Sequence, residues 1–178
     1  MVRNSIRKPP VPLDSAALRE LALTYVGRFA TSRARLARYL ERKLRERGWG
    51  GEDGPEVEAL VARFAELGYV DDAGYARMKG ASMERRGLGA RRIAESLRAD
   101  GVAEADRADV EAAARRGRRA AAEILARRKR IGPYAAEEAD PKRRERQIAA
   151  FLRAGHDLDT ARLWVCAAPG DFPPDDEG

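Results

Sequence analysis

Cysteine and histidine are almost absent from this chain of 178 residues, which contains one of each, Cys166 and His156. A single cysteine cannot form a disulfide within the chain, and the two residues are too few for a zinc site built from thiolate and imidazole ligands. Thiol catalysis would need a positioned histidine as activator. The sequence therefore predicts no metal site and no catalytic cysteine, and it suits a reducing compartment.

Glycine-rich phosphate-binding motifs are also missing. No GxxxxGK[ST] occurs, and the glycine clusters at 48–51 and 87–89 do not extend to a GxGxxG pattern. Asp71 and Asp72 could suggest a metal pair, but adjacent side chains diverge on a helix, and aspartate at a helix start is a typical cap. We therefore expect no enzyme activity and no cofactor.

Long apolar runs do not occur either. The segment MVRNSIRKPPVPLD has no apolar core of a signal peptide, and no uncharged run approaches the roughly 20 residues of a membrane span. We expect a cytoplasmic protein that does not contact a membrane. No helical pattern is apolar all round, which favours a monomer.

Positive charge is what the chain has in excess. Lys and Arg number 35 against 29 Asp and Glu, a net charge of +6. The last ten residues carry four acids and no base, so the rest of the chain has a net charge of +10. A body this basic favours a polyanionic or acidic-faced partner. Aromatic residues make up only 6% of the chain, which favours phosphate contact over base stacking.

Apolar residues recur at spacings of three and four, and β-branched residues are sparse, so the predicted fold is all-α. The sequence up to Val70 predicts three helices, which start at Ser15, after the cap Ser32 and at Val57, the last two ending at Gly48 and Gly68. Three helices of this size with short connections predict a small bundle.

The pattern repeats along the chain. Equivalent helix ends are marked by Leu44-x3-Gly48-Trp49, Leu97-x3-Gly101-Val102 and Phe151-x3-Gly155-His156, whose glycines are almost evenly spaced. A period of roughly 50 residues predicts tandem three-helix, helix-turn-helix-like modules that form an elongated curved array. Gly117 is expected to break the helical pattern that runs from residue 105 to residue 130.

These boundaries give a flexible N-terminal segment over 1–14, modules over 15–70, 71–117 and 118–167, the third with a loop at 131–141, and a disordered Pro/Asp-rich acidic tail over 168–178. In the second module, the side chains expected to face inward are those of Tyr75, Met78, Ser82 and Met83. Burial of both Leu163 and Trp164 would indicate a third bundle. His156 is expected to be a half-buried packing residue.

Arginine clusters carry the positive charge. The candidate contacts for an acidic partner are Arg35, Arg38, Arg42 and Arg45 on the outer face of the second helix, Arg85, Arg86, Arg91 and Arg92 around the second glycine turn, and Arg127, Arg128 and Arg130. The run 115–119 adds four more arginines. Acids such as Glu46 and Glu95 lie nearby in the sequence, so a solvated face without a partner is the alternative for any single cluster.

Residues 67–102, LGYVDDAGYARMKGASMERRGLGARRIAESLRADGV, resemble the RecX family of recombinase regulators. The shared features are a hydrophobic-Gly-aromatic turn, Asp-Asp-x-x-Tyr-Ala, Arg-Arg-Gly-x-Gly-x-x-Arg-Ile and a Leu-x3-Gly-hydrophobic close. The structural positions of this motif are Gly68, Asp71, Asp72, Tyr75, Gly87, Gly89, Ile93, Leu97 and Gly101. Residues 28–49 are similar to the family's first module, and RIGPY with RAGHDLDTARLWV is similar to the third, so the resemblance covers roughly residues 15–167.

The resemblance implies tandem three-helix modules, no catalysis and binding to the RecA recombinase. Proteins of this family lodge in the groove of the RecA–DNA filament, hinder its extension or promote its disassembly, and restrain strand exchange, ATP hydrolysis and the coprotease role of RecA in the SOS response. We expect the first two arginine groups to face the filament, with single- or double-stranded DNA as a candidate second partner. The 131–141 loop and the acidic tail have no counterpart in the family pattern.

A second interpretation is a DNA-binding protein that acts without RecA. RRGLGARRIAESL, residues 85–97, also fits the turn and recognition helix of a helix-turn-helix protein. Recognition helices usually carry Asn, Gln, Ser or Thr for base edges, and only Ser96 is available here. A HEAT-type scaffold fits less well, because its repeat of about 40 to 47 residues is shorter.

Overall fold

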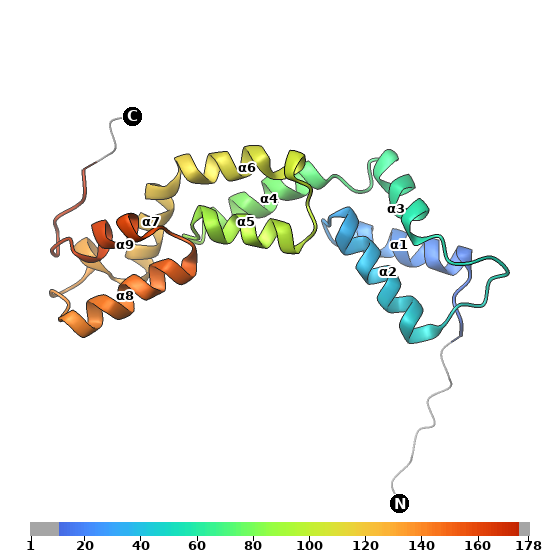
Figure 1. Ribbon diagram of the computed structural model, residues 1–178, viewed down its shortest axis with the longest axis horizontal. Coiled ribbons are helices and arrows are strands. Elements are labelled where there is room, and N and C mark those ends of the chain that lie inside the picture. Colours follow the sequence, from blue (N-terminus) through green and yellow to red (C-terminus); the bar gives the residue numbers. More distant parts are fainter. Residues whose placement is uncertain (1–10, 175–178) are drawn as a thin grey trace, which may run out of the picture. The chain divides into compact units, whose positions relative to one another are not determined.

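The computed structural model describes residues 11–174 (Figure 1). Within that range the chain forms nine α-helices and one short 3-10 turn, which confirms the expected all-α fold. The helices belong to two compact units, Met1–Asp72 and Ala73–Gly178. The flexibility expected for residues 1–10 and the disorder expected for residues 175–178 lie outside the described residues.

Unit 1 contains the three helices expected from the sequence, α1 (Ser15–Arg28), α2 (Arg33–Arg47) and α3 (Val57–Glu66). The Asp14 carboxylate caps α1, and the Ser32 hydroxyl caps α2 by accepting from the Arg35 N–H. Helix α2 packs on both α1 and α3 and buries Leu36 and Leu40 completely between them. Local capping and apolar spacing were therefore enough to predict these three helices.

Leu13 belongs to the core of unit 1, so the flexible segment expected through residue 14 was wrong at this position. Its side chain is fully buried. Its N–H donates to the Gly48 carbonyl at 2.9 Å, and its carbonyl accepts from the Gly50 N–H at 2.8 Å, which pairs it with Trp49. Local periodicity gives no sign of this pairing, because helices α1 and α2 separate the two partners in the sequence.

Asp72, the last residue of unit 1, is buried and caps a helix from a distance. Its carboxylate accepts from the Arg33 N–H at 2.8 Å and from the Arg33 Nε at 3.2 Å. The Arg33 N–H is one of the groups left unpaired at the start of α2, so Asp72 completes the cap that Ser32 begins. Asp72 is also the first residue of α4 (Asp72–Glu84), directly after Asp71.

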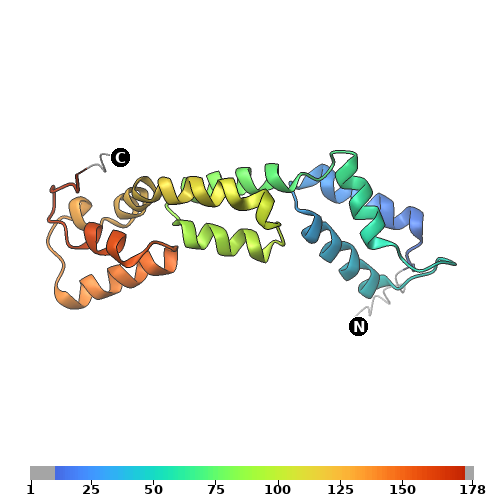
Figure 2. The same cartoon turned by 45° about the horizontal axis from the view of Figure 1, so that its top comes forward.

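Unit 2 contains the rest of α4 and the helices α5 (Ala90–Ala99), α6 (Glu104–Arg116), α7 (Arg118–Lys129), α8 (Pro141–Ala154) and α9 (Leu158–Val165), with the turn η1 (Gly132–Tyr134). The expected break at Gly117 is confirmed, because it separates α6 from α7. Helix α5 packs on α6, and α9 packs on both α7 and α8. Figure 2 shows α8 and α9 side by side, as Figure 1 does.

Two apolar clusters form the interior of unit 2. One gathers residues between 75 and 114 around the fully buried Ile93 and Leu97, and the other gathers residues between 122 and 165 around Phe151. Leu88 packs against both clusters. The inward prediction is confirmed for Tyr75 and Met83, whereas Met78 is 50% exposed and was assigned wrongly.

Helix α9 buries one of the two side chains that were named as the sign of a third bundle. Trp164 is buried, as a third bundle requires, but Leu163 is 41% exposed. The two side chains are adjacent on a helix and therefore point about 100° apart, so a helix packed along one side buries only one of them. The criterion of burial at both positions is therefore met by Trp164 and not by Leu163.

A joint between helix ends connects α5 to α8 within unit 2. The Gly89 N–H donates to the Ala154 carbonyl at 2.9 Å, and the Arg91 N–H donates to the Gly155 carbonyl at 3.3 Å. The first N–H groups of α5 and the last carbonyls of α8 thus satisfy each other, although neither has a partner within its own helix. His156 lies at this joint with an exposed fraction of 3%, so it is fully buried rather than half-buried as expected.

The first described residues of the acidic tail are packed, so the disorder expected from residue 168 was wrong for them. The Gly170 N–H donates to the Pro133 carbonyl at 3.0 Å. The Phe172 ring meets the Tyr134 ring edge-on, with 5.2 Å between the ring centroids. The expected 131–141 loop contains η1, and its residues 131–133 are buried.

Candidate functional site

The predicted arginine stripe of α2 lies on the face opposite the buried Leu36 and Leu40. Arg38, Arg42 and Arg45 are exposed, and Arg35 is half-buried. An acid on the same face offsets part of this charge, because Glu46 lies 3.6 Å from the Arg42 Nε and 2.6 Å from the Lys43 Nζ. The hydrogen bond from Lys43, with the positive charges around it, lowers the pKa of Glu46, which keeps it ionised.

The second arginine group divides by how much of its charge is already paired. Arg85 and Arg86 are exposed on the turn after α4, and neither forms an ion pair with a residue that the structure describes. Arg91 and Arg92 lie 3.8 Å and 3.4 Å from Glu95. Arg91 also donates to the Leu152 carbonyl, so part of its hydrogen-bonding capacity holds α5 against α8.

The third group is at the C-terminal end of α7. Arg127 donates to the Glu123 carboxylate at 2.8 Å and to the Tyr134 hydroxyl at 3.1 Å. The hydrogen bond to Tyr134 is the largest of the effects that raise the pKa of Arg127. Arg128 and Arg130 are exposed, and Arg130 ends α7 with a left-handed φ of 53°. Arg127 therefore serves to fix η1, while its two neighbours stay at the surface.

The motif residues within 67–102 lie in the apolar core, in turns and where two helices meet. Ile93 and Leu97 are fully buried in the core. The turn glycines Gly68, Gly87 and Gly101 have φ of 76°, 73° and 74°. Gly89 allows the close approach of α5 to Gly155, where a Cβ would lie 2.5 Å from the carbonyl carbon. These positions give each of these motif residues a structural role in the core, in a turn or at a close helix contact.

Sequence reasoning missed the partner of Tyr75. The Tyr75 hydroxyl donates to the Asp100 Oδ2 at 2.6 Å, and the Lys79 ammonium forms an ion pair with the same oxygen. The carboxylate thus holds α4 against the end of α5, which explains a tyrosine at this largely buried position. Separations of 25 and 21 residues hide this contact from any helical spacing rule.

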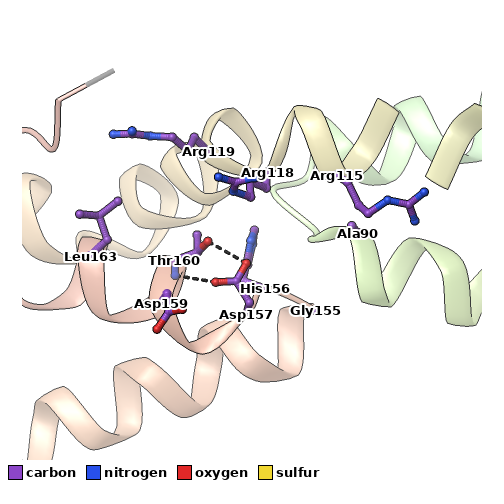
Figure 3. A pocket seen from close by; sticks show the side chains of 10 residues that line it. All are labelled: Ala90, Arg115, Arg118, Arg119, Gly155, His156, Asp157, Asp159, Thr160 and Leu163. Atoms are coloured by element: carbon purple, nitrogen blue, oxygen red, sulfur yellow. Dashed lines mark hydrogen bonds between the residues drawn. The ribbon is translucent and has the colours of Figure 1, made fainter. Parts of the chain in front are cut away.

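A cavity of about 570 Å³ lies between the α6–α7 junction and the start of α9 (Figure 3). It is lined by Ala90, Arg115, Arg118, Arg119, Gly155, His156, Asp157, Asp159, Thr160 and Leu163. In Figure 3, Arg118 lies between Arg115 and Arg119, above Asp157 and Thr160. Arg115, Arg118 and Arg119 thus share one rim of the cavity, as their spacing of three and four residues allows.

Two ionisable groups in this cavity have shifted pKa values. Burial lowers the pKa of His156, against the opposing effects of its hydrogen bond to the Gly87 carbonyl and of the nearby Asp157. Burial of Asp157 would by itself raise its pKa, but hydrogen bonds from the Thr160 N–H and hydroxyl, with the charge of Arg118, lower it overall. With the imidazole neutral, the positive charge of this cavity comes from Arg115, Arg118 and Arg119, and guanidinium groups suit an anion.

Two kinds of feature are absent from the described residues. No group of three or more His, Cys, Asp or Glu side chains in that part of the chain is arranged to hold a metal ion. Among the helices within residues 11–174, none combines the length and the apolar character that crossing a membrane requires.

Comparison with known proteins finds relatives among curated proteins and among solved structures. Regulatory protein RecX of Myxococcus xanthus (strain DK1622) is 35% identical over 170 residues, which cover 91% of this chain and 91% of that protein. Regulatory protein RecX of Deinococcus radiodurans is 37% identical over 94 residues, which cover 53% of this chain and 43% of that protein. The crystal structure of RecX from Lactobacillus salivarius aligns with a TM-score of 0.58 over 82% of this chain and 90% of that chain. No protein-family model matches the chain.

These findings define the class first. At 17% identity the crystal structure shows a shared fold, and the curated relatives are named as regulatory proteins. The chain is thus similar to a class of all-α regulatory proteins. Its identity to the Myxococcus protein extends over nearly the full length of both, so the chain belongs to the RecX family, and the resemblance drawn from residues 67–102 is confirmed.

Proposed function

We propose that this chain binds the RecA nucleoprotein filament and inhibits its extension, ATP hydrolysis, strand exchange and coprotease activity. In this role it modulates recombinational DNA repair and the SOS response, without catalysis of its own. The observation that carries the proposal is family membership over 91% of the chain. The exposed Arg85 and Arg86 and the α2 stripe support it, because a filament of protein and DNA offers phosphates and acidic side chains to such surfaces.

The organisation that we propose for this role is three consecutive modules, over 15–70, 71–117 and 118–167. Three separate apolar clusters support this division, one in unit 1 and two in unit 2. Residues from several helices form each cluster, as a small helical repeat requires. Whether the second and third modules open independently is measurable by amide hydrogen exchange, residue by residue.

The experiment that tests the function is single-stranded-DNA-dependent ATP hydrolysis by RecA, measured against added protein at two salt concentrations. Binding of the protein to the same DNA without RecA is titrated in parallel. We expect hydrolysis to fall at protein concentrations that leave the free DNA mostly unbound. The shift of half-inhibition between the two salt concentrations reports how much of the contact is ionic.

The second candidate, a DNA-binding protein that acts without RecA, predicts a different result. It requires tight binding to free DNA and unchanged hydrolysis at concentrations below saturation of that DNA. The favouring observation is limited to the basic turn and helix over 85–97, in which Ser96 is half-buried. Competition between duplexes of different sequence would then show a preference, which phosphate contact alone does not give.

A further inference from the structure

The first residues of the acidic tail are anchored on unit 2 by described contacts. The Gly170 N–H donates to the Pro133 carbonyl, and the Asp171 N–H donates to the Ala168 carbonyl, both at 3.0 Å. The Phe172 ring meets the Tyr134 ring at 77°. Tyr134 is itself held, because its hydroxyl donates to Glu123 at 2.7 Å. The path of the chain is therefore fixed up to residue 172.

Beyond Phe172, the chain lies along an arginine-lined groove. This groove is a second cavity, distinct from the one in Figure 3 and also of about 570 Å³. It is lined by Arg116, Gly117, Arg119, Ala120, Glu123, Trp164, Phe172 and Pro173. The Arg119 guanidinium donates to the carbonyl oxygen of Pro174, the last described residue. The tail thus reaches the α6–α7 junction with its backbone already bound to an arginine.

The charges on the two sides of this contact are complementary. Pro174 is followed in the sequence by Asp175, Asp176 and Glu177. An extended chain covers about 3.5 Å per residue, so all three acids stay within about 10 Å of the Pro174 position. The junction contributes four arginines within residues 115–119. Arg116 and Arg119 line this groove, and Arg119 binds the Pro174 carbonyl, so the three acids stay within about 10 Å of the point where the tail meets an arginine, which is about the Debye length at 0.1 M salt.

We propose that this arginine groove at the α6–α7 junction is an anion-docking surface whose occupant is the chain's own acidic end, Asp175–Glu177. The docked tail offsets arginine charge at the junction that an external polyanion would also contact. It acts as a competitor built into the chain, so a polyanion gains access to the junction only by displacing it. The proposal concerns the isolated chain and does not depend on the proposed action on RecA.

The direct test places a nitroxide spin label at the end of the tail. The chain has one cysteine, the exposed Cys166, so the variant C166S/G178C carries a single labelling site. Residue 178 stays within about 14 Å of Pro174 in any state, so the readout is the mobility of the label and not its proximity. At low salt we expect the EPR spectrum of an immobilised nitroxide, and a mobile spectrum at high salt and in the same protein carrying D175N/D176N/E177Q. A mobile label at low salt, or an immobilised label that neutralising the acids does not release, would overturn the proposal.

The competition is measured as affinity for a fluorescent oligo(dT), with a control matched in charge. Neutralising the tail should tighten binding about threefold at low salt, the size expected for one exposed ion pair. The control E52Q/D53N/E56Q removes three acids from a loop of unit 1, so it changes the net charge equally without touching the tail. In an R116Q/R119Q background, neutralising the tail should have no further effect. An equal gain in the control, or no gain with the neutral tail, would contradict a local dock.

Discussion

Gly89 and Gly155 are in direct backbone contact within unit 2, where the start of α5 meets the end of α8. A Cβ added to Gly89 would lie 2.5 Å from the Gly155 carbonyl carbon, and one added to Gly155 would overlap the Arg92 backbone nitrogen. These contacts are to backbone atoms, which cannot rotate away as a side chain can. The two glycines therefore set how closely the two apolar clusters of unit 2 approach each other. Leu88 packs against both of these clusters.

The first prediction is that G89A destabilises unit 2. The added methyl group must push α5 away from α8 and break the 2.9 Å hydrogen bond to Ala154. We expect the free energy of unfolding to fall by about 2 to 4 kcal/mol, as for other overpacked and strained sites. Urea unfolding followed by the fluorescence of Trp164 in a W49F background reports on unit 2 alone.

The control for G89A is G27A in α1. A Cβ on Gly27 would meet no atom within 4 Å. Alanine is the better helix former, so this change should raise the free energy of unfolding of unit 1 by about 0.5 to 1 kcal/mol. Wild-type stability of unit 2 in G89A would show that α5 and α8 can move apart without loss of stability. The close contact at Gly89 would then not be needed.

The second prediction concerns the cap that Asp72 gives to α2. D72N removes the charge that Arg33 pairs with and one of two acceptors, in a side chain that is only 5% exposed. We expect unit 1 to lose about 1 to 3 kcal/mol, the usual cost of an impaired buried, charged hydrogen bond. Urea unfolding followed by Trp49 fluorescence in a W164F background measures it. The control E41Q neutralises an exposed acid on α2 and should change stability by less than about 0.5 kcal/mol.

The part of the fold that the sequence predicted is the part set by neighbours in the chain. Ser32 as a cap and Gly117 as a break depend on residues within one helical turn, so spacing and residue type were sufficient. Leu13, Asp72 and Gly89 have partners in distant parts of the sequence, and no local rule links them. Their contacts form only after the helices have packed.

The candidate site divides in the same way. The sequence predicted that Arg85 and Arg86 lie at the surface, and both are exposed, although the glycines that follow them, Gly87 and Gly89, are buried. Arg91 and Arg127 are exposed too, but they form ion pairs with Glu95 and Glu123. An acid four residues away on a helix is visible in the sequence, but the carbonyl of Leu152 and the hydroxyl of Tyr134 are not.

The third prediction tests the arginines on the turn after α4. R85E/R86E should raise the protein concentration needed for half-inhibition of RecA ATP hydrolysis by about fivefold or more, because two attractive ionic contacts become repulsive. The matched variant R146E/R153E reverses two exposed arginines of α8 and makes the same change in net charge. It should alter inhibition much less.

Circular dichroism must give the same helicity for both charge-reversal variants and for the wild-type chain, so that any difference reflects the surface. Equal inhibition by R85E/R86E and the wild type would remove these two arginines from the interface. Equal loss in both variants would mean that only the net charge of the chain acts on the filament.

The fourth prediction is a pH dependence that comes from His156. The Nε2–H donates to the Gly87 carbonyl at 3.0 Å, while Nδ1 is buried without a hydrogen-bond partner among the described residues. Protonation of Nδ1 would place a charge in the joint between α5 and α8, which explains why burial lowers the pKa of His156 from its ordinary value of 6.5. The folded chain therefore keeps this imidazole neutral.

The sign of the effect follows from which state binds the proton. Below about pH 6.5 the unfolded chain protonates His156 while the folded chain does not, so the free energy of unfolding falls as the pH falls. The contribution is fully present above pH 6.5 and is lost progressively as the pH approaches the lowered folded pKa. The lowered pKa of Asp157 acts in a separate window, because its stabilising effect is lost only as the pH falls below its ordinary value of 3.8.

Two measurements check this prediction. His156 is the one histidine of the chain, so its imidazole signal in a proton–carbon NMR titration is unambiguous. The midpoint of its chemical-shift change should lie below pH 6.5. Urea unfolding of unit 2 at pH 7.5 and pH 5.5 should show lower stability at the lower pH. H156Q retains a donor for the Gly87 carbonyl but cannot titrate, so its stability should be equal at the two pH values. A wild-type imidazole that titrates near pH 6.5 would mean that the joint admits water, and that His156 does not make unit 2 sensitive to acid.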